Sequence, residues 1–490
     1  MLDGRWFYVA LLALGFGCGD DAPAVMDGGG VAPDAGSGGP DASVEAPRIP
    51  WLAEGTPPID LPWLDAGAPP IDWTCPTGWR EASFEGAQAC EPFAGEEPDR
   101  CAAGEAQLPG SAGCAPIGRA CGDGRFPATD DVPAETPIVY VDAAATGDGE
   151  GSREDPARTL ADGLDLATSG TLVVLGAGSY AVDRAWPDGV SLRGLCASRT
   201  DVVAEGARDA VLGLGAGTGV RAIEDVTIVS AGSPALRVSG AGARVELRGL
   251  ALRSSGTLPA ALRVQDGAEV LVDGLVAAHV AAGSADAFGI AVEGGASLEG
   301  QRVSLDGFAG IGLSVAGAGS AASLTRGIIR RTAERSPASA LGSGAQAREG
   351  ATLVLREVAL LGNVETGIAA SGAGTTATLE DLVVRGTQGT EGFYSAGIGI
   401  LLGAQATAAR VLVAGNTDTG IATDSAAASL TLRDAVVTGT QARDGTSSAG
   451  LFALRTATLD LERVAAIRNA TNAIAATEGG NVTARDVVAG

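Results

Sequence analysis

Hydrophobic and polar positions alternate along the C-terminal two-thirds of the chain. In residues 415–439, GNTDTGIATDSAAASLTLRDAVVTG, aliphatic side chains take every second position over stretches of about five residues. A period of two is typical of β-strands that are buried on one face, whereas an amphipathic helix has a period of 3.6. Gly and Ala separate the stretches, so the pattern predicts short strands joined by turns.

The phrase recurs every 23 to 30 residues, measured at the aliphatic residue that follows a charged position. These aliphatic anchors are Val226, Leu250, Leu275, Val303, Ile328, Val358, Leu382, Val411, Ala435, Val464 and Val487. Repeats of this length built from short strands predict a parallel β-solenoid, in which each coil stacks about 4.8 Å above the previous one. We expect about a dozen rungs, with the aliphatic residues filling a narrow bore.

A corner of each coil is expected four residues after the anchor, where Gly recurs at positions 307, 362, 386, 415 and 439. Gly suits a backbone with positive φ. His279, the only histidine of the chain, takes this place in one repeat. We interpret it as a solvated turn residue rather than as a catalyst or a metal ligand.

Charged residues form two columns just before the anchors. The first contains Glu357, Asp381, Arg410, Asp434, Arg463 and Asp486, and the second contains Arg356, Glu380, Arg433, Glu462 and Arg485, with Ala409 between them. The sign mostly alternates from one repeat to the next, so opposite charges are expected to stack and to stabilise the ladder modestly. A catalytic site would gather carboxylates instead. The sequence therefore identifies no catalytic residue.

The longer intervals fall in every second repeat, over 279–288, 332–344, 387–396 and 440–449. Asn363, Asn416 and Asn469 are likewise 53 residues apart, which makes the later unit a pair of rungs. The extra residues are expected to project from one edge of the rod as a row of loops, where solenoids often bind partners. Phe393 and Tyr394 in one loop are candidate ligand-binding residues, and the alternative is that they fold back over the rod.

Composition narrows the choice of partner. The net charge of −26 argues against nucleic acid, because a duplex needs a cationic surface to displace its counterions. The chain carries no P-loop, no GxSxG elbow and no calcium-loop pattern, so no cofactor and no metal are expected.

The N-terminus has the features of a secreted protein. The apolar run from Trp6 to Phe16 is too short to span a bilayer and has the length of a signal-peptide core, which predicts a signal peptide over 1–17. Cys18 follows a small residue, and this site resembles the lipobox of bacterial lipoproteins, although Gly15 stands where that family usually has Leu. The resemblance implies that Cys18 is lipidated. The alternative is an ordinary secretory signal. Residues 18–72, rich in Pro, Gly and Asp, are expected to form a disordered tether.

Five cysteines, Cys75, Cys90, Cys101, Cys114 and Cys121, lie within a Gly- and Pro-containing stretch that we assign to a disulfide module over 73–136. No CxxC pair and no nearby His supports a zinc site. Since five is odd, we expect Cys196 to pair with one of them and to join the module to the following domain. The connectivity of the six cysteines stays open, because 15 arrangements are possible.

The segment PIVYVDAAATGDGEGSREDPARTLADGLDLATSGTLVVLGAGSYA resembles the opening of bacterial surface β-helix proteins, and residues 138–490 resemble the right-handed, single-stranded parallel β-helices of the pectin-lyase-like superfamily. The resemblance implies a first strand and capping helix over 137–188, followed by β-helix repeats over 189–490. We expect Asp155 to cap the helix, Pro156 to begin it, and a face of Leu160, Leu164 and Ala167 to cover the end of the rod. The cysteine module also resembles lipoproteins of myxobacterial type.

Three functions remain open at this point. The preferred hypothesis is a non-catalytic lipoprotein, anchored by lipid in the outer membrane or at the cell surface of a Gram-negative bacterium, whose loops bind a polysaccharide or an envelope protein. The alternative is a polysaccharide lyase or glycoside hydrolase, since the superfamily includes both. The third is a structural spacer.

Overall fold

The computed structural model describes residues 73–84, 87–95, 100–147, 149–206, 208–217, 220–254, 260–279, 287–333, 342–390, 395–443 and 448–490. All of them belong to one compact unit, Ala68–Gly490. The predicted signal peptide, Cys18 and the tether lie outside the described residues. Within the described part of the chain, no helix is both long and apolar enough to cross a membrane.

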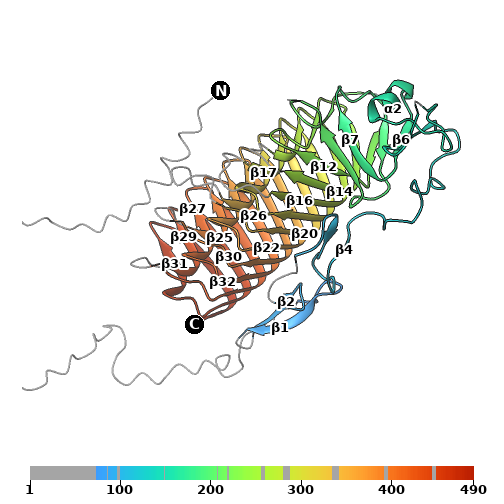
Figure 1. Cartoon of the computed structure of the whole chain (residues 1–490). Coiled ribbons are helices and arrows are strands. Elements are labelled where there is room, and N and C mark those ends of the chain that lie inside the picture. Colours follow the sequence, from blue (N-terminus) through green and yellow to red (C-terminus); the bar gives the residue numbers. More distant parts are fainter. Residues whose placement is uncertain are drawn as a thin grey trace, which may run out of the picture. The chain divides into compact units, whose positions relative to one another are not determined.

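The chain forms an all-β parallel solenoid of about 11 turns, as the repeat predicted (Figure 1). Each turn of the regular part contributes one short strand and one long strand, and the two kinds build two parallel sheets. The short-strand sheet consists of β10 (Leu212–Leu214), β13 (Leu236–Ser239), β15 (Ala260–Gln265), β17 (Ala287–Glu293), β19 (Gly310–Ala316), β21 (Ser343–Arg348), β23 (Thr366–Ser371), β25 (Ala396–Leu401), β27 (Thr419–Asp424), β29 (Ala449–Leu454) and β31 (Asn472–Thr477).

The second sheet contains the long strands and the strands of the first turns. The long strands are β14 (Arg244–Ser254), β16 (Glu269–His279), β18 (Ser297–Asp306), β20 (Ala321–Arg330), β22 (Thr352–Leu361), β24 (Thr376–Arg385), β26 (Gln405–Ala414), β28 (Ser429–Thr438), β30 (Thr458–Ile467) and β32 (Asn481–Ala489). The strands of the first turns are β5 (Ile138–Val141), β6 (Leu172–Leu175), β7 (Gly178–Val182), β8 (Ser191–Arg193), β9 (Thr200–Ala204), β11 (Val220–Glu224) and β12 (Thr227–Ser230).

Each long strand bends in its middle, at the first charged column. Glu357, Asp381 and Arg410 have φ between 52° and 56°, and the ladder of paired residues passes over them. The first turns show the same bend as a break, because β11 and β12 lie on either side of Asp225 and both pair with β14. The predicted glycine corner is a second such point, since all five of its glycines have positive φ. Charged residues thus occupy a left-handed corner that the sequence pattern did not reveal.

The strand register confirms all but one of the predicted anchors. Val303 and Val358 face Gly327 of the intervening strand, not Ile328, which lies one position further on. Two adjacent isoleucines cause the error, because both are buried but on opposite sides. Ile329 belongs to the bore, whereas Ile328 packs on the outer face with residues of the disulfide module.

An interior column of polar residues explains the 53-residue spacing. Asn416 is fully buried, its side-chain oxygen accepts from the Thr387 backbone N–H at 2.8 Å, and its amide donates to the Val384 carbonyl at 3.2 Å. Asn363 and Asn469 make the same two bonds to the preceding rung. Each asparagine therefore provides an acceptor for a backbone N–H of the turn and ties that turn to the end of the preceding strand.

The helix near the N-terminal end is α2 (Leu160–Leu166). The expected start of the helix was wrong: it begins at Leu160 rather than Pro156, and the Thr159 hydroxyl caps it by accepting from the Asp162 N–H at 3.1 Å. Asp155 instead accepts from the Glu150 N–H at 3.4 Å, within the preceding loop. Leu160 and Leu164 are buried in the solenoid core and Ala167 packs against it, as expected of a helix that covers this end.

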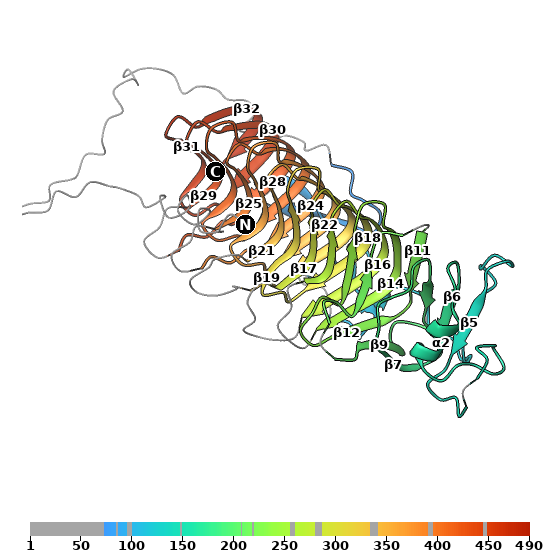
Figure 2. The same ribbon diagram turned by 90° about the horizontal axis from the view of Figure 1, so that it is seen from above.

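The disulfide module, here the described residues between 73 and 131, lies along the outside of the long-strand sheet (Figures 1 and 2). Its strands are β1 (Arg80–Phe84), β2 (Ala87–Glu91), β3 (Glu105–Ala106) and β4 (Ala115–Pro116). The six cysteines form three disulfides, Cys75–Cys90, Cys101–Cys114 and Cys121–Cys196. The expectation that Cys196 joins the module to the solenoid is thus confirmed.

The module runs along the solenoid from the later turns towards the first turns. The turns of the solenoid follow one another in the opposite direction. Its strand β2 contacts β26 and β28, and Glu91 pairs with Arg385 of β24. Further along, the Arg119 N–H donates to Asp225 at the first bend. Gly249 and Gly274 replace the charged residue at two bends because a Cβ there would collide with the backbone of Gly118 and Ile117.

Candidate functional site

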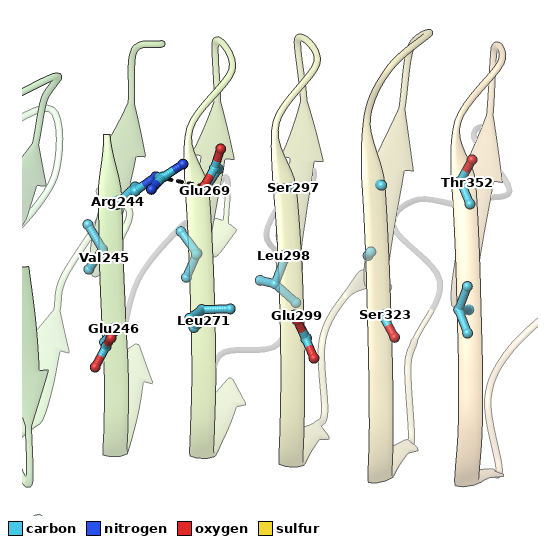
Figure 3. A pocket seen from close by; sticks show the side chains of 14 residues that line it. Arg244, Val245, Glu246, Glu269, Leu271, Ser297, Leu298, Glu299, Ser323 and Thr352 are labelled. Atoms are coloured by element: carbon cyan, nitrogen blue, oxygen red, sulfur yellow. Dashed lines mark ion pairs between the residues drawn. The ribbon is translucent and has the colours of Figure 1, made fainter. Parts of the chain in front are cut away.

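An exposed groove crosses the first halves of β14, β16, β18, β20 and β22, and it has a volume of about 470 Å³ (Figure 3). These strands present every second side chain to solvent, because their other face fills the bore. The registers place the outward residues in two rows. One row is Glu246, Leu271, Glu299, Ser323 and Val354, and the other is Arg244, Glu269, Ser297, Ala321 and Thr352.

The groove combines an apolar platform with acidic side chains. Leu271 is 50% exposed, which is the largest value among the large hydrophobic residues of the described part of the chain. It lies between Glu246 and Glu299 in one row (Figure 3). Such a row offers carboxylate acceptors for hydroxyl groups on both sides of a surface that an apolar ring face can cover.

Only part of the charge in the groove is neutralised within it. Arg244 pairs with Glu269 at 2.9 Å, and Arg248 pairs with both Glu246 and Glu224. Glu299 has no ion-pair partner among the residues that the structure describes. The groove is therefore acidic, like the chain as a whole, and favours a neutral or cationic ligand.

Beyond β22 the same two rows continue with uncharged polar side chains. Thr376, Gln405 and Ser429 extend one row, while Thr378, Thr407 and Thr431 extend the other. They are exposed or half-buried. The candidate binding face is thus a polar strip along the rungs, with the groove at its N-terminal end.

The charge columns next to this strip are paired between neighbouring rungs of the ladder. Arg410 donates to both oxygens of Asp381 at 2.7 and 2.9 Å, and Arg463 does the same to Asp434 at 2.7 Å. In the second column Arg356 pairs with Glu380 at 2.9 Å and Arg433 with Glu462 at 3.1 Å. The predicted stacking of opposite charges is confirmed.

The remaining predicted site residues give less information. Cys18, Phe393 and Tyr394 lie outside the described residues, as do most of the expected projecting loops, so lipidation and loop binding stay predictions. His279 ends β16 and its backbone pairs with Ser254. Among the described residues, no group of three or more His, Cys, Asp or Glu side chains could hold a metal ion.

A recurring hydrogen bond that was not predicted from the sequence is present where each long interval returns to the rung. The residue that resumes the rung donates its N–H to a side chain 23 positions later: Gly342 to Glu365 at 3.2 Å, Ser395 to Asp418 at 2.9 Å, and Ser448 to Thr471 at 3.2 Å. The three acceptors are 53 residues apart. The asparagines have the same spacing of 53 residues, and this repeat in the sequence was the signal from which the three acceptors could have been predicted.

No protein-family model matches the chain, and no curated protein matches it. Among solved structures it is similar to pectate lyase Pel9A (11% identity, TM-score 0.34, covering 72% of this chain and 78% of that one). It is also similar to the catalytic unit of the GH87 α-1,3-glucanase of Streptomyces thermodiastaticus (14%, TM-score 0.35, 72% and 68%). A third similar structure is the A-module of the Azotobacter vinelandii mannuronan C-5 epimerase AlgE4 (12%, TM-score 0.33, 66% and 93%).

At these identities and scores, the activities named for those proteins say nothing about the chemistry of this chain. The fold follows from its own strand registers: successive turns pair in parallel from β10 to β31 in one sheet and from β14 to β32 in the other. The chain is a parallel β-helix, as its sequence predicted, with a disulfide module laid along its outside.

Proposed function

We propose that the polar strip binds a neutral polysaccharide that extends along the rungs, and that the protein performs no reaction on it. The observation that carries the proposal is the row Glu246, Leu271, Glu299 in the groove. Sugar rings have one apolar face and a rim of hydroxyls, which match an exposed leucine flanked by carboxylates. The distance between successive rungs, about 4.8 Å, is close to the length of one sugar unit in a polysaccharide.

Charge selects the class of polymer. The groove contains Glu246, Glu269 and Glu299 against Arg244, and the chain carries a net charge of −26. A polyuronate such as pectin or alginate would meet like charge along the strip, which costs affinity. Neutral polymers such as xylan, β-glucan or cellulose avoid this repulsion.

Affinity electrophoresis and pull-down on a panel of neutral and anionic polysaccharides test the proposal. Leu271→Asp, which adds charge and removes the platform, should weaken binding of the neutral polymer at least tenfold, and Glu299→Gln should weaken it less. Leu166→Asp is the matched control, because Leu166 is 47% exposed at the end of α2 and does not line the groove. Binding of pectin or alginate as strong as that of every neutral polymer, or an unaffected Leu271→Asp variant, would refute it.

A second candidate, a glycoside hydrolase, has one observation in its favour. Glu246 and Glu299 share a row two rungs apart, which separates their backbones by about 9.6 Å, close to the upper end of the roughly 6.5–9.5 Å between the carboxyl groups of inverting glycosidases. Against it, Glu246 is paired with Arg248. Release of reducing ends from a bound polymer that stops in both Glu246→Gln and Glu299→Gln would establish this alternative.

We also propose that the protein is a lipoprotein of the outer membrane or cell surface, held through Cys18 and the tether. The apolar run before Cys18 and the three disulfides support this, because disulfides persist in oxidising compartments. In a Gram-negative host the full chain should fractionate with membranes, and Cys18→Ala should release it into the soluble fraction. Recovery of both proteins in the same fraction would exclude the anchor.

A further inference from the structure

A second cavity of about 420 Å³ lies on the short-strand side of the first turns, away from the groove. It is lined by Ala185, Arg208, Asp209, Ala210, Gly213 and Arg237. Gly213 of β10 pairs in register with Arg237 of β13, and nothing lies within 4 Å of where a Cβ of Gly213 would be. The missing side chain leaves the space beside the Arg237 guanidinium open.

Neither arginine of this pocket makes a hydrogen bond to a carboxylate of the described residues. The Nε atoms of Arg208 and Arg237 are buried and have no hydrogen-bond partner. The nearest ion pair joins Arg237 Nη1 to Asp209 at 3.7 Å, beyond hydrogen-bond distance, and the Asp209 side chain is 87% exposed. Asp183, a further acid in this region, is paired with Arg184 at 3.1 Å.

The next turn provides an internal comparison. Arg263 of β15 pairs in register with Arg237, and its Nε donates to Glu293 at 2.7 Å. The same column therefore holds one arginine that is hydrogen-bonded to a carboxylate and one whose nearest carboxylate, that of Asp209, lies 3.7 Å away. The terminal nitrogens of Arg237 are not held by a hydrogen-bonded carboxylate of the described residues, and the side chain is 34% exposed, so an acceptor from solvent can approach them.

We propose that this pocket binds a small organic acid through its carboxylate. Guanidinium groups present parallel N–H donors that match a planar carboxylate, and two of them line this cavity. In a chain with a net charge of −26, a pocket with two arginines and one exposed Asp reverses the local charge. The volume exceeds that of a bare ion and has room for a body the size of one sugar acid.

Isothermal titration of the full chain with glucuronate, glucose, sulfate and phosphate tests the inference. We expect glucuronate to bind, more weakly as salt is added, and glucose not to bind. Arg237→Ala should weaken glucuronate at least tenfold, and Arg237→Lys, which keeps the charge but loses the fork, should weaken it partly. The matched control is Arg263→Ala, which should leave the affinity unchanged.

Glucuronate that binds no better than glucose, or equally well to the Arg237→Ala and Arg263→Ala variants, would overturn the proposal. Sulfate as tight as glucuronate would also overturn it, because the organic body would then contribute nothing. Unchanged thermal unfolding midpoints show that the variants fold. Leu271→Asp should not alter glucuronate binding, so this test and that of the polysaccharide strip fail or succeed separately.

Discussion

Arg443 donates from two nitrogens to the two carboxylate oxygens of Asp418, at 2.9 Å from Nε and 2.5 Å from Nη2. Asp418 is fully buried and also accepts from the N–H and hydroxyl of Ser395. Arg443 donates in addition to the Thr390 carbonyl, 53 residues earlier. The Arg443–Asp418 ion pair therefore connects residues 390 and 395, on either side of one long interval, with residue 443 at the start of the next.

Removing this carboxylate should be costly. In Asp418→Ala, Arg443 loses its carboxylate partner and the Ser395 N–H loses its acceptor, so we expect the free energy of unfolding to fall by about 3 kcal/mol. Urea unfolding measures it. Glu269→Ala, which breaks a pair whose side chains are 62% and 52% exposed, should cost at most about 1 kcal/mol. Equal losses in the two variants would contradict the role assigned to Asp418.

The buried asparagines should be equally sensitive. Asn416→Ala leaves the Thr387 N–H without its acceptor and removes the bond to the Val384 carbonyl, and we expect a loss of about 1–3 kcal/mol. Asn481→Ala, at an exposed position of β32, is the control and should change stability by less than about 0.5 kcal/mol. Amide hydrogen exchange at Thr387 should accelerate only in the first variant.

The three disulfides should contribute unequally. Cys121–Cys196 closes a loop of 75 residues, whereas Cys101–Cys114 closes one of 13. Loop-closure entropy predicts stabilisation of about 4.5 and about 3 kcal/mol, respectively. Paired Cys→Ser replacements, compared by thermal unfolding, should therefore rank the long-range bridge first. The reverse order would mean that strain or residual structure outweighs chain entropy.

Acid should weaken the contact between the module and the first turns. Burial raises the pKa of the Asp131 carboxyl, but hydrogen bonds and charges from Arg193 and Arg119 outweigh it and lower this pKa from 3.8 to about 2. A lowered folded-state pKa stabilises above the unfolded value, and this stability is lost as pH falls from about 4 to about 2.

The size of this effect is modest, because the Asp131 side chain is 51% exposed and solvent screens the pair to about 1 kcal/mol or less. Asp131→Asn should thus be slightly less stable than the parent chain at pH 6 and equal to it at pH 2. Urea midpoints across this range decide the matter, and a difference that persists at pH 2 would rule out the charge as its source.

The period of the aliphatic residues was sufficient to predict the solenoid, because one stacked position repeats in every rung. It predicted the wrong isoleucine, Ile328, as an anchor, because the module covers the outer face of the strand and makes the residues on that face apolar as well. Continuous aliphatic runs such as Val358 to Leu361 are typical of strands buried on both faces, and they were the available sign of that cover. The bend at Glu357 was missed because a charged residue occupies a conformation usually marked by Gly.

The candidate sites were harder to predict. Glu246, Leu271 and Glu299 are ordinary outward positions of three separate repeats, and only the register brings them into one row. Likewise, nothing in the sequence around Arg237 indicates that its counterpart Arg263 is hydrogen-bonded to a carboxylate while the nearest carboxylate to Arg237 lies 3.7 Å away. The projecting-loop prediction falls mostly on residues outside the described part of the chain.

The opposite course of the module changes how the molecule assembles. A bare solenoid interacts only between adjacent turns, so it can fold from any point and fray from either end. Here Glu91 pairs with Arg385, 294 residues later in the sequence. A segment that is synthesised early therefore docks on turns that are synthesised much later. Such non-local closure raises contact order and ties distant turns into a single cooperative transition.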